Sequence, residues 1–274
     1  MPKKKTVEEI YDRYAVGYSS GDFAPSAFDN ARTAMTFADD ITWFFLQKYA
    51  PKDRNLAYIL DAGAGDGYWA QKFLELGYKN IVLVDLSQKM LDQAKERLNK
   101  LAVKKNVQFV KTDILNLNEI QTNTFDYVFS QYDAVSYCMN PQIAIKQLTR
   151  VAKPRAYVIV CLDTKFRRVP EFIETKQIKT AVKLLRSNVS NEFGHPQYNF
   201  SWEELAENFA KAGLEVIEAV GAPVFMHQID EDILNELEQD PEIRGELLNI
   251  ELQYCTDKSL INFAGHLQMI GKKK

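Results

Sequence analysis

The sequence predicts an α/β protein with a doubly wound, mostly parallel sheet of seven strands. Short apolar runs alternate with helix-like segments over the middle of the chain. Strands joined by helices of this length form right-handed β-α-β units, which place neighbouring strands parallel. The runs NIVLV and YVIVCL are almost wholly apolar, as expected of strands that helices cover on both faces.

The strands and helices can be placed along the chain by their periodicity. Strands are expected at 57–63, 80–87, 107–114, 125–132 and 156–164, with helices between them at 68–76, 88–103 and 141–152. Ser201 and Glu204 have the spacing of a capping box, which predicts the start of a further helix. A sixth strand follows Gly213, and a last one is expected at 266–272.

The pattern outside these segments suggests how the chain is organised. Residues 7–18 and 34–49 are predicted helices that precede the sheet, and we expect 1–55 to form an N-terminal helical cap. Residues 56–274 then form the main domain. Two late insertions, at about 165–200 and 226–265, interrupt its strand and helix pattern.

Composition excludes several classes of protein. A chain of 274 residues with 46 % apolar residues can bury a core without disulfide or metal staples. The net charge of −3 disfavours nucleic acid as a partner. No apolar run is long enough for a membrane span or resembles a signal peptide. Three widely spaced cysteines fit reduced thiols in the cytoplasm, and with no zinc-type spacing we expect no metal.

A glycine-rich turn, LDAGAGDGYW, follows the first predicted strand. A dinucleotide fingerprint requires GxGxxG, but counting from Gly63 the third glycine would fall at position 68, which is Tyr. A phosphate loop with GxxxxGK is also absent. Asp61 and Asp66 flank the turn and would repel phosphate. The turn therefore requires another kind of ligand.

Three acids lie at the ends of three successive predicted strands. Asp85 comes about twenty residues after the turn, where a carboxylate can accept hydrogen bonds from both ribose hydroxyls. Asp113 can accept from the exocyclic amine of adenine, with Leu86 and Ile114 as apolar walls. Together with Asp61, these acids match a nucleoside that carries an ammonium and a sulfonium.

These segments resemble the class I S-adenosylmethionine-dependent methyltransferases. The matching segments, in order, are LDAGAGDG, VLVDLS, FVKTDIL and FDYVFSQYDAVSY, followed by LTRVAKPRAYVIV. The family usually has LKPGG in the last of these, where this chain has AKPRA. The resemblance covers residues 56–164 and, less closely, 200–225. It implies a Rossmann-like methyltransferase fold and S-adenosyl-L-methionine as the cofactor.

The resemblance also implies roles for individual residues. The backbone of the turn would pass along the methionine part of the cofactor, Asp61 would hold the ammonium directly or through water, and the Ser130 carbonyl would bind it too. Asp85 would hold the ribose, and Asp113 the adenine. In similar enzymes a tyrosine-bearing N-terminal segment closes over the cofactor, and a nearby arginine can pair with the cofactor's carboxylate. A tyrosine and an arginine of this chain would take these roles, although the helical spacing of the tyrosines fits core packing equally well. The positions expected from the turn and this segment are Gly63, Ala64, Gly65, Tyr14 and Arg32.

Candidates for catalysis are few, because the chain has three histidines. His195 lies in a predicted loop before the late helix, and His227 follows the sixth strand. Asp133 follows the fourth strand, near the position where the methyl group should point. Each of these has an ordinary surface or loop role as the alternative. His266 opens the last strand and is expected to be structural.

The predicted function is methyl transfer by in-line displacement to an O or N atom of a small molecule. The chain lacks an NPPY-type tetrapeptide after the fourth strand and has no basic domain, which favours a small-molecule acceptor. A tRNA or protein acceptor is an alternative, and so is a protein with this fold that binds the cofactor or a partner without catalysis. The chain is expected to act as a monomer or homodimer.

Overall fold

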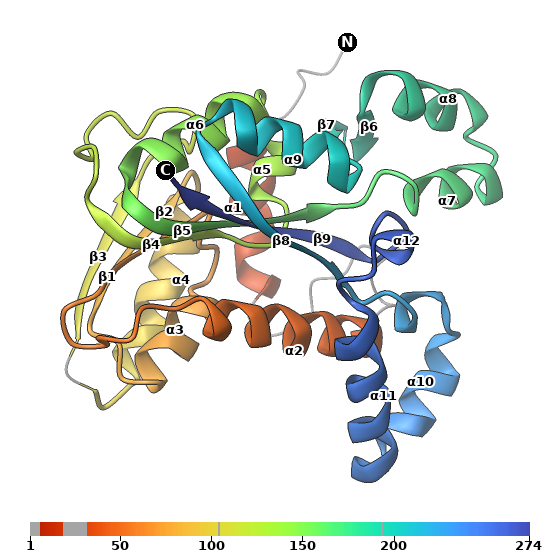
Figure 1. Cartoon of the computed structure of the whole chain (residues 1–274), viewed down its shortest axis with the longest axis horizontal. Helices are drawn as coiled ribbons and strands as arrows, with labels where there is room; N and C mark the ends of the chain where they lie inside the picture. Colours follow the sequence, from red (N-terminus) through yellow and green to blue (C-terminus); the bar gives the residue numbers. More distant parts are fainter. Residues whose placement is uncertain (1–5, 19–31, 104, 193) are drawn as a thin grey trace.

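A computed structural model describes residues 6–18, 32–103, 105–192 and 194–274. Its centre is a seven-stranded sheet in the order β3-β2-β1-β4-β5-β9-β8 (Figure 1). The first five strands in this order are parallel, and β9 runs antiparallel to both β5 and β8. This arrangement confirms the predicted fold class. The strand order reverses between β1 and β4, which is where doubly wound sheets bind ligands.

The strands lie close to their predicted positions. They are β1 (Tyr58–Ala62), β2 (Asn80–Asp85), β3 (Asn106–Lys111), β4 (Phe125–Ser130), β5 (Ala152–Asp163), β8 (Leu214–Ala222) and β9 (His266–Lys273). The start of β5 differs from the prediction, which began at 156. Ala152 already pairs with Phe125 of β4, before an irregularity in the register.

One face of the sheet is covered by α2 (Arg32–Lys48), α3 (Tyr68–Glu75) and α4 (Gln88–Asn99). The core on this face is aromatic: the ring of Phe73 stacks on Phe129 of β4 at 5.3 Å and meets Trp43 of α2 edge-on at 5.1 Å. Ile41 and Leu46 of α2 are completely buried in the same cluster. Helix α2 is thus part of the main core.

The opposite face is covered by α6 (Pro141–Val151) and α9 (Trp202–Lys211). The predicted capping box is present at the start of α9. The Ser201 hydroxyl accepts from the Glu204 amide at 3.3 Å, and the Glu204 carboxylate accepts from the Ser201 amide at 2.9 Å. This reciprocal pair satisfies two amides at the helix start and fixes where α9 begins.

The remaining elements lie around the end of the sheet where β1 to β5 finish. Helix α1 (Val7–Tyr18) packs on α4. The short helix α5 (Ala134–Tyr137) follows β4, and the first insertion contains α7 (Arg168–Glu174), α8 (Ile178–Ser187) and a hairpin of β6 (Val189–Glu192) and β7 (His195–Tyr198). The second contains η2 (Met226–Gln228), α10 (Glu231–Glu238), α11 (Pro241–Tyr254) and α12 (Lys258–Ile261). Figure 1 shows both insertions beyond the end of β5.

Each helix of the described residues is too short or too polar to cross a membrane.

A buried carboxylate positions the second insertion. Glu251 of α11 is fully buried and accepts hydrogen bonds from the amides of Val224, Phe225 and Met226 at 2.7 to 2.8 Å. These amides form the turn between β8 and η2. Because hydrogen bonds to a charged group are stronger than neutral ones, Glu251 joins this turn firmly to α11.

We expect Glu251→Ala to lower the free energy of unfolding by about 3 kcal/mol, since it leaves three buried amides without an acceptor. Glu246→Ala is the matched control, because Glu246 is exposed on the same helix, and its effect should stay within about 0.5 kcal/mol. Urea denaturation of both variants measures the difference. Equal midpoints for the two variants would show that Glu251 does not stabilise the turn.

Candidate active site at the carboxyl edge of the sheet

The glycine turn after β1 has a backbone conformation that favours glycine. Gly63 and Gly65 have φ angles of 76° and 53°. A Cβ atom on Gly63 would lie 2.2 Å from the Cβ of Ala134 at the start of α5. The amides of Gly63 and Ala64 both donate to the Val84 carbonyl of β2, at 2.7 and 2.9 Å. The turn is therefore held between the ends of β2 and β4.

Asp61 lies beneath this turn and is almost completely buried. Its carboxyl group is hydrogen-bonded to the Ala70 amide, but its Oδ2 has no partner. Burial raises the pKa of Asp61 well above its usual value, and the nearby charges of Asp85 and Asp66 raise it further. A buried carboxylate oxygen without a partner is costly, so this position suits a cationic ligand group.

Asp85, at the end of β2, joins the two loops beside it. Its Oδ2 accepts from the Gly65 amide at 2.9 Å and its Oδ1 from the Ser87 amide at 2.8 Å. Burial raises its pKa, while these backbone hydrogen bonds oppose the change. A Cβ on Gly65 would meet no atom within 4 Å, so the turn is open to a ligand at this point.

The third acid lies on the neighbouring strand end. Asp113 follows β3 by two residues and accepts from the Leu115 amide at 2.8 Å, which fixes the loop. Ile114 is buried next to it, and Leu86 after β2 is half-buried. The sheet order β3-β2-β1 thus brings Asp113, Asp85 and Asp61 to one edge.

Two other acids near this edge have structural partners. Asp66 forms an ion pair with Arg97 of α4, which also donates to the Asp66 carbonyl at 3.0 Å. Asp12 of α1 accepts from the hydroxyl of Ser87, the residue that caps α4. Arg97 therefore compensates the charge of Asp66, and α1 is tied to the loop that follows Asp85.

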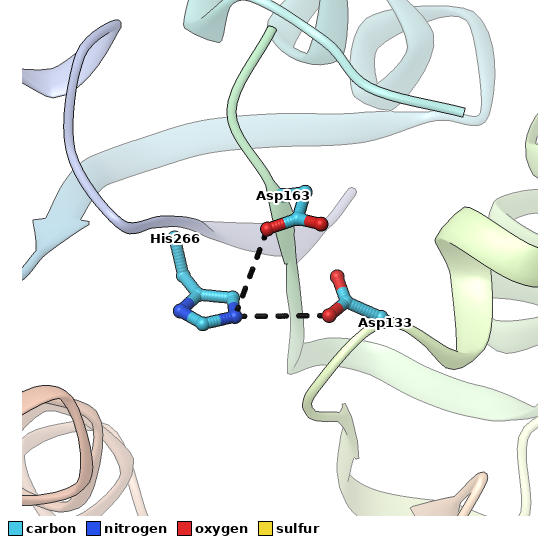
Figure 2. A group of neighbouring side chains, drawn as sticks. All are labelled: Asp133, Asp163 and His266. Carbon is cyan, nitrogen blue, oxygen red and sulfur yellow. Dashed lines mark ion pairs between the residues drawn. The ribbon is translucent and has the colours of Figure 1, made fainter. Parts of the chain in front are cut away.

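A second group of polar residues lies beside the turn, on the other half of the edge. Asp133 follows β4, and Asp163 and His266 are paired residues at adjoining ends of β5 and β9. His266 Nε2 lies 3.7 Å from Asp133 Oδ2 and 3.8 Å from Asp163 Oδ1 (Figure 2). Because Ala134 touches Gly63, this group adjoins the glycine turn.

The group is fixed by further contacts. Asp163 accepts from Arg167 at 2.9 Å and from the Gln197 amide of β7, and Gln197 also donates to the Tyr137 hydroxyl at 3.3 Å. Tyr132 and Asp133 have positive φ angles of 47° and 72°, which are strained for residues other than glycine. Such strain is concentrated at functional sites, where surrounding contacts maintain it.

Comparisons with known proteins agree with this geometry. The model of a methyltransferase domain matches residues 59–155, which contain the glycine turn and the three acids. The tRNA 5-carboxymethoxyuridine methyltransferase of Escherichia coli K12 is 22 % identical over 223 residues, which cover 78 % of this chain and 79 % of that protein. The chain is a class I S-adenosylmethionine-dependent methyltransferase.

Two further comparisons extend this result. A malonyl-[acyl-carrier protein] O-methyltransferase of Marinomonas sp. MWYL1 is 36 % identical over 102 residues, which cover 37 % of this chain and 36 % of that protein. A structure of magnesium protoporphyrin IX methyltransferase from Synechocystis PCC 6803 has a TM-score of 0.60 and 12 % identity, and covers 97 % of this chain and 98 % of that one. The latter shows that the two proteins share the fold.

The residues at the edge fit S-adenosylmethionine, the cofactor of the methyltransferase. The unpartnered Oδ2 of Asp61 is suited to an ammonium, and the open space at Gly65 leaves room beside Asp85 for a ribose. Ser130 is fully buried at the end of β4 and its hydroxyl has no partner. The predicted role of its carbonyl stays a prediction. The side chains of Tyr14 and Arg32 lie outside the described part of the structure.

The three predicted catalytic residues do not come together. Asp133 belongs to the group in Figure 2. His227, in η2, is half-buried, and this desolvation lowers its pKa to about 4, so it is neutral at physiological pH. His195 is the first residue of β7 and not part of a loop, and in this hairpin it is Gln197 that contacts Asp163. The fold instead places His266 beside Asp133.

We expect Asp85→Ala to weaken binding of S-adenosylhomocysteine by about 30-fold or more, because it removes a charged acceptor that also holds the Gly65 amide. Asp92→Ala is the control, since Asp92 is an exposed acid on α4. Isothermal titration calorimetry measures both. Unchanged affinity in Asp85→Ala would contradict the assignment of Asp85 to the ribose.

Binding should also depend on pH through Asp61. Its raised pKa keeps a fraction of the free protein protonated, whereas an ammonium requires the ionised carboxylate. Affinity for S-adenosylhomocysteine should therefore rise with pH until Asp61 is ionised without ligand, and binding below that pH should release a proton. Calorimetry in two buffers with different ionisation enthalpies measures the release. Asp61→Asn should abolish it, and equal release in that variant would exclude Asp61 as its source.

Proposed function

We propose that this methyltransferase transfers a methyl group to an oxygen or nitrogen atom of a small molecule bound beside Gly63. The observation that supports this proposal most is the enclosure of the polar group around His266. Helix α1, helix α5 and the β6–β7 hairpin are connected to one another and to Asp163 of this group. Tyr11 of α1 meets the Tyr137 ring of α5 edge-on at 6.3 Å, and Gln197 of β7 connects Tyr137 to Asp163.

Helix α1 spans both halves of the edge. On the cofactor side, Glu8 forms an ion pair with Lys111 at the end of β3 at 2.7 Å, and Asp12 contacts Ser87. On the acceptor side, Tyr11 contacts α5. In our proposal a helix in this position encloses both ligands, which suits an acceptor of limited size. The predicted N-terminal cap and the two acceptor-side insertions are also part of this proposal.

The cofactor supplies the methyl group, as a sulfonium whose methyl–sulfur bond breaks with its electron pair going to sulfur. In our proposal the protein holds the ammonium at Asp61, the ribose at Asp85 and the adenine between Asp113 and Ile114. Transfer then depends mainly on how the acceptor is aligned. Fixing two reactants in a near-attack geometry can contribute on the order of 7–11 kcal/mol.

The relatives suggest a second candidate, a macromolecular acceptor. One relative is named for tRNA and the other for an acyl-carrier protein, although the second covers only 37 % of this chain. The net charge of −3 makes this chain a poor electrostatic match for RNA. We therefore keep tRNA and protein as outcomes of the test, and retain a cytoplasmic monomer or homodimer as part of the proposal.

Transfer of labelled methyl groups distinguishes these acceptors. The protein is incubated with S-adenosylmethionine labelled in its methyl group and with cell extract divided into metabolite, RNA and protein fractions. We expect label in the metabolite fraction. Asp85→Ala, which should bind the cofactor poorly, is the negative control, and Asp92→Ala is the positive one.

Each alternative gives a different result. Label confined to RNA or protein would overturn the small-molecule proposal. No label in any fraction, from protein that binds S-adenosylhomocysteine, would favour a protein with this fold that does not catalyse transfer.

A further inference from the structure

We propose that His266 accepts a proton from the acceptor, and that the methylated group is therefore a hydroxyl or an amine and not a carboxylate. This inference rests on the proposed function. It extends the proposed function by assigning the chemical class of the acceptor. It also gives a catalytic role to His266, which the sequence suggests is structural.

The orientation of the imidazole carries the argument. Nε2 faces the carboxylates of Asp133 and Asp163, whereas Nδ1 is on the side of the ring away from both (Figure 2). His266 is 7 % exposed, and its Nδ1 is buried without any partner. A histidine that is oriented by carboxylates at one nitrogen and free at the other is arranged as a general base.

The environment of His266 favours proton uptake. Burial alone would lower the pKa of His266, but Asp133 and Asp163 outweigh it, so the pKa lies above 6.5. Arg167 opposes this effect, and His227 is close enough for its charge to interact with that of His266. Tyr132 packs edge-on against the imidazole at 5.2 Å, and its hydroxyl is hydrogen-bonded to Asp39 of α2.

The charge around the group disfavours a carboxylate acceptor. Three acids from three elements, Asp39, Asp133 and Asp163, lie on this side of the edge, and Arg167 already binds Asp163. A further carboxylate would be repelled and would need no base, because it is already ionised at neutral pH. A hydroxyl loses its proton as it is methylated, and an ammonium must lose a proton before its nitrogen can attack, so both benefit from a base.

Two aspartates and a histidine are also a common donor set for divalent metals. Here their ligand atoms lie within 4.8 Å of one another. However, both oxygens of Asp163 already accept hydrogen bonds, one from Arg167 and one from Gln197. A metal ion would displace these donors and lie beside a guanidinium. The contacts therefore favour proton transfer over metal binding.

The chemistry balances without any further reactant. The acceptor oxygen or nitrogen forms the bond to the methyl carbon, and its proton passes to Nδ1 of His266. The resulting imidazolium is stabilised by Asp133 and Asp163 until the proton leaves to solvent. Because His266 must be neutral to accept this proton, the rate of transfer should fall as the pH drops below its pKa.

The first test uses the wild-type protein and the labelled metabolite fraction. Mild alkali hydrolyses methyl esters and releases labelled methanol, whereas methyl ethers and methylamines are stable. We expect the label to stay in the non-volatile fraction. Release as methanol would show a carboxylate acceptor and overturn this inference, while leaving transfer to a small molecule intact.

The second test uses variants with the same labelled fraction. His266→Gln should keep its affinity for S-adenosylhomocysteine but transfer methyl groups about 10²- to 10⁴-fold more slowly. Lys211→Gln, a change at an exposed residue of α9, is the control and should transfer at the wild-type rate. A His266→Gln variant that binds the cofactor product and transfers at the wild-type rate would exclude His266 as the base.

A third measurement needs no acceptor and remains informative even if His266→Gln fails to fold. Nuclear magnetic resonance of the imidazole groups follows the titration of the three histidines. His266 should titrate above 6.5, and His227 near 4. Asp133→Asn should lower the pKa of His266. A wild-type His266 that titrates at or below 6.5, or one that Asp133→Asn leaves unchanged, would contradict the role given to the two carboxylates.

Discussion

The active site depends on the hydrogen bonds that the carboxylate of Asp85 accepts. This carboxylate accepts hydrogen bonds from Gly65 in the glycine turn and from Ser87 at the start of α4, and so joins the two loops beside the proposed cofactor site. Ser87 in turn caps α4 and donates to Asp12 of α1. One carboxylate therefore fixes the turn, the start of a helix and, through Ser87, the helix that covers the edge.

Two groups of polar residues lie at the edge of the sheet where β1 to β5 end. Asp61 and Asp85 lie at the ends of β1 and β2, and Asp113 follows the adjacent strand β3. In our proposal these three acids present acceptors to a cationic nucleoside. On the other side, the ends of β4 and β5 and the start of β9 bring together Asp133, Asp163 and His266. Gly63 lies between the two groups, and its lack of a side chain allows α5 to approach the turn.

The cofactor half of this arrangement could be predicted from the sequence, because it depends on local features. Asp61 and Asp85 lie at the ends of short apolar strands, and Asp113 lies just after one. Because parallel strands end at one edge, neighbouring strands bring these three acids together. The sequence could also exclude a dinucleotide as the ligand of the glycine turn, because Tyr68 occupies the position where the fingerprint requires glycine.

The acceptor half could not be predicted, because it depends on contacts between distant residues. His266 meets Asp163 only through the antiparallel pairing of β9 with β5, and Gln197 reaches it only from the β6–β7 hairpin, which has no clear strand pattern. One signal was available. Asp163 ends an apolar strand and His266 begins another, so antiparallel pairing of the two strands places them side by side.

A crystal structure of the protein with S-adenosylhomocysteine tests the division of the edge most directly. Our account predicts that the ribose hydroxyls bind Asp85, and that the sulfur atom faces the space next to Asp133 and His266. A sulfur atom that points away from His266, or a ribose held elsewhere, would contradict it.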